Sequence, residues 1–175
     1  MPLKFDGVTL FLWGALDAVC GMEYDEYYQL LAAGQNPEEL TVFRLRDHQL
    51  NIPEDGLYTL KSTVATHPET CAAMRSALLE GWRGAVRHPE QAMKYIRLYA
   101  ERDGARFDPA HQFWMLNLFG KSLEINGAQA GTLDPAAYES TVRALRRSGL
   151  IAKSVGYRDF CPGLPLPSAS SGGKP

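Results

Sequence analysis

"THPETCAAMRSALLEGWRGAVRHPEQAMKYI", residues 66–96, decides the expected fold because it contains two helix starts in succession. Pro68 and Pro89 are each expected in a first helical turn, where a backbone N–H would have no partner within the helix. Glu69 lies where the helix dipole favours a negative charge. Between the prolines, apolar side chains recur at helical spacing, at Met74, Leu78, Trp82 and Ala85. We therefore predict one helix that ends near His88 and a second that begins at Pro89.

The same start signal recurs twice downstream. Asp108-Pro109 and Asp134-Pro135 each place a capping side chain directly before a proline, and apolar residues at helical spacing follow both. The last of these helices is predicted to stop at Gly149. Upstream, residues 24–33 predict a shorter helix because tyrosines and a leucine share one face before a glycine.

Three shorter stretches have the character of strands. Residues 17–21 form a short apolar run that ends at glycine, residues 40–45 alternate and are rich in β-formers, and residues 57–66 are extended in character. Residues 10–16 are apolar and fit either a short helix or a strand. From residue 162 the chain is rich in Pro, Gly and Ser, so residues 161–175 are predicted to form a disordered tail.

The totals exclude several classes of function. With 175 residues, 45% hydrophobic and 22% charged, the chain fits an ordinary globular domain. A net charge of −2 gives no basic field for nucleic acid, so no nucleic-acid partner is expected. At helical spacing, the local cluster of Arg143, Arg146 and Arg147 favours a solvated helix face over a phosphate grip. No stretch is long and apolar enough to predict a membrane span.

Cysteine and histidine usage gives no metal or cofactor motif. The three cysteines, Cys20, Cys71 and Cys161, form no CxxC pair, and the four histidines are scattered. We therefore expect neither a metal site nor a cofactor. The N-terminus lacks a charged region and a cleavage site of the secretory type, so a complete chain of this sequence would be expected to stay in the cytoplasm.

The order of these features resembles the C-terminal portion of the NMT1/THI5-like family. That family contains solute receptors of ABC importers for nitrate, sulfonates, taurine and thiamine-pyrimidine precursors, together with fungal pyrimidine synthases of thiamine biosynthesis. The resemblance extends over about residues 10–160. Its motifs are, in chain order, Gly14-x-x-Asp17-Ala18, Tyr24-Asp25-Glu26, Pro68-Glu69 with Ala77-x-x-x-Gly81-Trp82, His88-Pro89-Glu90 with Ala92, and Gly131-x-Leu133-Asp134 with Gly149-Leu150-Ile151.

The resemblance implies an α/β fold, a partial type II periplasmic-binding-protein fold in which a few strands precede a mainly helical C-terminal half. It divides the chain into residues 1–46 at the end of the second lobe, residues 47–66 crossing the hinge, and residues 67–160 packing on the first lobe. The N-terminal lobe of the family has no counterpart here, so a separate lobe or self-association is expected to complete the cleft. An ABC permease is the implied partner, with a periplasmic or membrane-associated location.

The resemblance also points to a ligand site at the start of the helix predicted for residues 24–33. A planar heterocycle needs an aromatic face and a carboxylate that accepts its N–H groups, and Tyr24 and Glu26 would supply these. Met22 would form a soft apolar wall, and Asp25 completes the candidate set. Packing is the equal alternative for Tyr24 and Glu26, because acids in a first turn are stabilised by the dipole and tyrosines at helical spacing usually pack.

The function that the resemblance implies is solute binding for an ABC importer, with a small organic or heterocyclic ligand and no catalysis. A synthase relative is the enzymatic alternative, but the cysteine-rich motif and the lysine–histidine cofactor site of the fungal synthases have no match in this sequence. A third alternative is an oligomerising remnant that binds no ligand.

Overall fold

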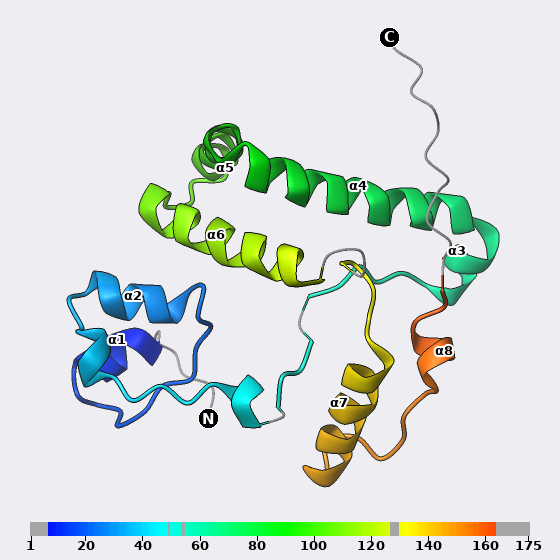
Figure 1. Ribbon diagram of the computed structural model, residues 1–175, viewed down its shortest axis with the longest axis horizontal. Helices are drawn as coiled ribbons and strands as arrows, with labels where there is room; N and C mark the ends of the chain where they lie inside the picture. The colour runs from blue at the N-terminus through cyan, green and yellow to red at the C-terminus, as the bar shows by residue number, and fades with distance from the viewer. Residues whose placement is uncertain (1–6, 49, 54, 127–129, 164–175) are drawn as a thin grey trace. The chain divides into compact units, whose positions relative to one another are not determined.

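The computed structural model describes residues 7–48, 50–53, 55–126 and 130–163 (Figure 1). In those ranges the chain forms α-helices joined by irregular segments and two short 3-10 helices, η1 and η2. The elements, in chain order, are α1 Gly7–Leu12, α2 Glu26–Ala32, η1 Pro37–Glu39, η2 Leu45–His48, α3 Lys61–Thr66, α4 Pro68–Arg87, α5 Pro89–Arg102, α6 Pro109–Asn126, α7 Pro135–Arg147 and α8 Tyr157–Phe160.

The expected α/β class is wrong, because the described residues contain no β-strand, and a partial type II periplasmic-binding fold is therefore not what this chain shows. Residues 17–21 and 41–44 are irregular, and the second half of the stretch 57–66 is helix α3. A strand is stable only when its backbone groups pair with a neighbouring strand. The β-forming side chains instead remain in solvent, with Phe43 77% and Tyr58 74% exposed.

The helix predictions made from prolines and caps are confirmed. Helices α4 to α7 begin at Pro68, Pro89, Pro109 and Pro135, and the helix expected over residues 24–33 is α2. The Asp134 carboxylate accepts a hydrogen bond from Ala137 N at 3.1 Å, and Asp108 Oδ1 accepts from Ala110 N at 3.0 Å. These bonds satisfy first-turn N–H groups that the helix itself leaves unpaired.

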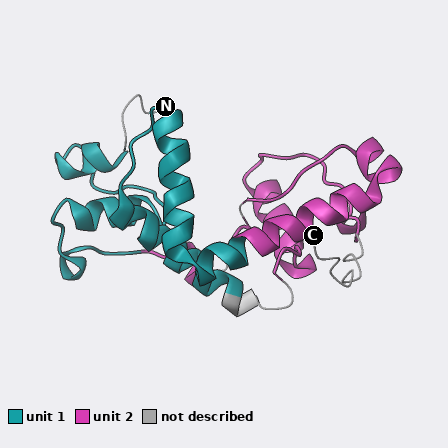
Figure 2. Cartoon of the chain, turned by 90° about the horizontal axis from the view of Figure 1, so that it is seen from above, with its two compact units in different colours: residues 1–42, 82–126 teal, residues 43–81, 127–175 magenta. Residues whose placement is uncertain are grey.

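The chain divides into two compact units (Figure 2). Unit 1 comprises residues 1–42 and 82–126, and unit 2 comprises residues 43–81 and 127–175. The boundary at residues 81 and 82 falls inside α4, so one helix contributes to both units. The four-segment division expected from the sequence stays a prediction, and residues 164–175 of its tail lie outside the described residues.

Unit 1 is built around α6. This helix is apolar on most of its circumference, and it contacts α5 and α2, while α2 also contacts α1. A Cβ added at Gly120 would lie 3.2 Å from Val86 Cγ1, so glycine permits a close approach between α6 and the end of α4. Few of the described side chains in this unit are buried. They are Val8, Leu30, Met93 and Leu116.

Unit 2 is held by two tyrosines that hydrogen-bond to backbone carbonyls. Tyr138, which is buried on α7, donates to Val155 O at 2.7 Å, and Tyr157 of α8 donates to Leu133 O at 2.7 Å. The two rings meet edge to face, with centroids 5.7 Å apart. Each phenol thereby has both an apolar contact and a polar partner, which fixes the loops around α7.

None of the described helices combines the length and the hydropathy that a membrane-spanning segment requires.

Candidate functional site

The candidate segment, residues 21–28, forms a tight turn into α2. Glu26 folds back so that its Oε2 accepts a hydrogen bond from Met22 N at 2.7 Å, while Met22 O accepts from Tyr27 N at 3.2 Å. Glu26 is the first residue of α2, so this bond holds its carboxylate against the backbone of the turn four residues earlier. Gly21 is required beside it, because a Cβ there would lie only 2.5 Å from Glu26 Cβ.

Tyr28 of α2 packs on aromatic side chains of α6. Its ring is stacked on the His111 imidazole, with centroids 4.7 Å apart and planes 3° apart, and it lies 5.6 Å from the Trp114 ring. Trp114 Nε1 donates to Glu23 O at 3.0 Å. This bond ties the turn before α2 directly to α6.

Tyr24 extends the same set of rings. Its centroid lies 5.3 Å from that of Phe119, and Phe119 is stacked on Trp82 at 4.8 Å. We call the six side chains the aromatic cluster: Tyr24, Tyr28, Trp82, His111, Trp114 and Phe119. All six belong to unit 1, and they come from three helices and the turn before α2.

Asp25 completes the contacts between this segment and α6. Its Oδ1 accepts a hydrogen bond from Gln29 Nε2 at 2.9 Å and lies 3.2 Å from His111 Nε2. The approach to His111 is an ion pair when the imidazole is protonated, but it is not aligned as a hydrogen bond, and the buried Nε2 has no hydrogen-bond partner among the described residues. The stacking contact of its ring with Tyr28, and not a hydrogen bond from Nε2, therefore positions His111.

The four residues predicted for a ligand site therefore divide between different contacts. Tyr24 packs on Phe119, Asp25 faces His111, and Glu26 binds the backbone of its own turn. Met22 is the most exposed of the four, at 42%. The sequence pattern gave no sign of His111 and Phe119 as their neighbours, because the contacts cross more than 80 residues; only the recurrence of rings along α6 hints at an aromatic face.

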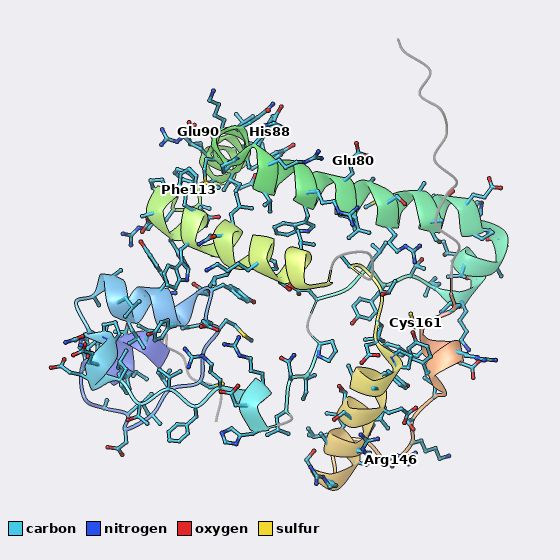
Figure 3. All side chains as sticks on the ribbon, viewed as in Figure 1. Glu80, His88, Glu90, Phe113, Arg146 and Cys161 are labelled. Carbon is cyan, nitrogen blue, oxygen red and sulfur yellow. The ribbon has the colours of Figure 1, made fainter. Side chains whose placement is uncertain are left out.

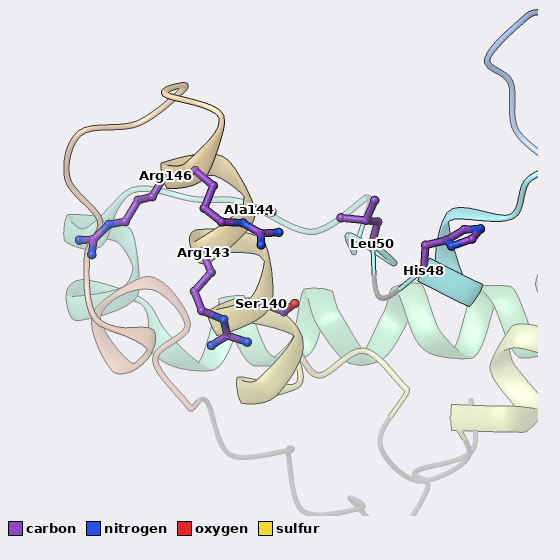
Figure 4. Close-up of a pocket in the computed structure, with 7 residues that line it drawn as sticks. His48, Leu50, Ser140, Arg143, Ala144 and Arg146 are labelled. Carbon is purple, nitrogen blue, oxygen red and sulfur yellow. The ribbon is translucent and has the colours of Figure 1, made fainter.

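Two cavities formed by described residues lie elsewhere. The first, of about 550 Å³, lies in unit 2 and is lined by residues of α7 together with His48 and Leu50 (Figure 4). The second, of about 560 Å³, lies in unit 1 at the start of α5, where His88 and Glu90 take part in its wall (Figure 3). None of Met22, Tyr24, Asp25 and Glu26 lines either cavity. Within the described part of the chain, no three His, Cys, Asp or Glu side chains are grouped so as to hold a metal ion.

Comparison with known proteins gives a match to a family. A family model described as NMT1/THI5 like matches residues 3–92 of the 175. The matched segment includes the turn before α2, the whole of α4 and the first residues of α5. No curated protein and no solved structure matches the chain.

Proposed function

The chain belongs to the NMT1/THI5-like family, and on that premise we propose that it acts as the solute-binding component of an ABC importer, or as part of one. Its ligand would be a small organic or heterocyclic molecule such as a thiamine-pyrimidine precursor, a sulfonate or nitrate. Binding, without catalysis, would deliver the ligand to a membrane permease on the periplasmic side. The family match is the observation that carries this proposal, and it confirms the resemblance over residues 3–92.

The turn before α2 supports a ligand contact at Glu26. A carboxylate has two oxygens and about four acceptor sites, and the bond from Met22 N to Oε2 occupies one of them. The same bond fixes the carboxylate in position before any ligand arrives, which lowers the entropic cost of binding. Tyr24, half-buried beside it, would contribute the edge or face of its ring.

The test is calorimetric titration of the whole chain with a pyrimidine, taurine, an alkyl sulfonate and nitrate. We expect saturable binding of one of these kinds of compound. Glu26→Gln should weaken this binding, because the amide keeps an acceptor oxygen but removes the charge. Glu69→Gln is the matched control, since Glu69 is also a first-turn acid, at the start of α4. Equal affinity of the wild type and Glu26→Gln would overturn the role of Glu26.

Self-association is the remaining part of the proposal, because the family places its ligand between two lobes. Native mass spectrometry with and without the bound compound measures it directly. A ligand that binds only the dimer would support completion of the cleft by a second copy. A folded chain that binds none of the four compounds in any oligomeric state would overturn the receptor proposal and favour a ligand-free remnant.

A further inference from the structure

The first cavity has a wall in which positive charge is concentrated. The charged side chains in its wall are three arginines, Arg143, Arg146 and Arg147, and no carboxylate takes part in the wall. His48, Leu50 and Ser140 line the same cavity. Because the whole chain has a net charge of −2, this concentration of positive charge is local and is not a consequence of composition.

The sequence register of α7 explains how the charges come together. Ser140, Arg143 and Arg147 are spaced by three and four residues, so they lie along one face of the helix. Arg143 and Arg147 form no ion pair with any described carboxylate, whereas Arg146 donates from Nη2 to Ser154 Oγ at 2.9 Å. Like charges four residues apart destabilise a helix slightly, and a bound anion would offset this repulsion.

The helix dipole explains only part of this arrangement. Arg146 and Arg147 stand in the last turn of α7, where positive charge is favoured by the partial negative charge of the helix end. Arg143 lies one turn earlier, and His48 comes from η2, so neither gains much from the helix end. A solvated helix face would need no second wall, yet His48 of η2 and the nearby Leu50 contribute one (Figure 4).

We propose that this cavity, the basic cavity, is an anion-binding site for a ligand that carries a phosphate or another doubly charged oxyanion group. Guanidinium groups match such oxyanions because their N–H donors form a planar fork that bonds two oxygens at once. Arg143 and Arg147 supply two forks on one helix face, and Ser140 and His48 supply further hydrogen-bonding groups. A volume of about 550 Å³ is in the range of small-molecule sites.

The basic cavity is independent of the proposed solute site. It lies in unit 2, while Glu26 and Tyr24 lie in unit 1, and its arginines fall outside the family-matched residues 3–92. The two sites can therefore be tested by different variants. Failure of either proposal leaves the other unaffected.

The experiment is calorimetric titration of the full chain at low ionic strength with inorganic pyrophosphate, and in parallel a flotation assay with vesicles that contain phosphatidic acid. The double variant R143Q/R147Q should lower pyrophosphate affinity about tenfold or more, because it removes two charged hydrogen-bond donors from the cavity wall. R143K/R147K keeps both charges but loses the forks, and it should lie between the wild type and the double glutamine variant. Circular dichroism verifies that each variant retains its helix content.

The matched control is R83Q/R87Q, which removes two arginines at the same spacing from α4. Arg87 borders the second cavity, whose wall also contains Glu90, so this variant should leave pyrophosphate binding within about twofold of the wild type. Binding of pyrophosphate that depends on Arg143 and Arg147 supports a soluble ligand. Vesicle binding alone with the same dependence supports a lipid headgroup as the source of the phosphate. No binding to either, or an equal loss in R83Q/R87Q, overturns the proposal.

Discussion

The imidazole of His111 lies flat against the phenol ring of Tyr28, with planes only 3° apart, and this stack joins α6 to α2. The two residues are 83 positions apart in the sequence. Around them, the aromatic cluster packs further rings between helices, while none of the described side chains is completely buried. The stability of unit 1 therefore depends on half-buried rings.

Replacing Tyr28 tests this dependence. Tyr28→Ala removes the contacts with both His111 and Trp114, and for a half-buried ring we expect the free energy of unfolding to fall by about 2 kcal/mol. Urea denaturation followed by tryptophan fluorescence measures the change. Tyr58→Ala is the control, because a ring that is 74% exposed should cost within about 0.5 kcal/mol. Equal losses in the two variants would contradict the role of the stack.

Gly131 combines a left-handed backbone with a close neighbour. Its φ is 77°, and an added Cβ would lie 2.9 Å from Leu79 Cδ1. Gly149 has a φ of 72° but no atom within 4 Å of an added Cβ. Gly131→Ala should therefore destabilise the protein by about 1–2 kcal/mol more than Gly149→Ala, since only the first pays for repacking as well as backbone strain. The measurement is thermal unfolding of both variants, and an equal loss would show that Leu79 moves aside without cost.

The capping bond of Asp134 should be measurable in the same way. Asp134→Ala leaves Ala137 N without its acceptor, and we expect a loss of about 1 kcal/mol in the free energy of unfolding. His88 occupies the corresponding position before α5 but forms no side-chain capping bond. His88→Ala should thus change stability by less than about 0.5 kcal/mol, and a larger loss than for Asp134→Ala would refute the assignment of the cap.

Tyr157 should make unit 2 sensitive to alkaline pH. Burial raises the pKa of Tyr157 above 10.0, and the neighbouring Cys161 and Asp134 raise it further. Since the folded state holds this proton more tightly than the unfolded chain, the resulting stability is fully present below pH 10 and is lost as the pH rises through the folded-state pKa. Deprotonation also removes the donor to Leu133 O.

Urea denaturation at neutral and alkaline pH measures the effect. Tyr157→Phe lacks the titrating group, so it should lose less stability between the two pH values than the wild type. Tyr58→Phe, which changes an exposed phenol, should behave as the wild type does. An alkaline loss of the same size in Tyr157→Phe would show that other groups cause it.

Local signals account for what was predictable in this fold. Proline in a first turn after Asp, as at Asp108 and Asp134, determines a helix start through contacts within three residues, so the sequence alone locates it. A strand has no such local determinant, because its backbone bonds go to a partner that lies elsewhere in the chain. Residues 40–45 have β-forming composition, but the structure provides no partner strand among the described residues, and the prediction failed there.

In the candidate site, too, local contacts could be predicted from the sequence and long-range contacts could not. The first-turn position of Glu26 is a local feature, and so is its bond to Met22 N, which spans only four residues. The neighbours of Tyr24 and Asp25 come from α6, and only the tertiary structure reveals them.

The aromatic cluster extends beyond the segment that matches the family. The family match ends at residue 92, whereas unit 1 continues to residue 126. A fragment cut at residue 92, where the family match ends, would retain Tyr24, Tyr28 and Trp82 but lose all of α6, with the rings on which they pack. It would also divide α5 after its first turn. Such a fragment would lose the ring contacts that α6 provides to these three side chains, so expression trials should keep the chain at least to the end of α6.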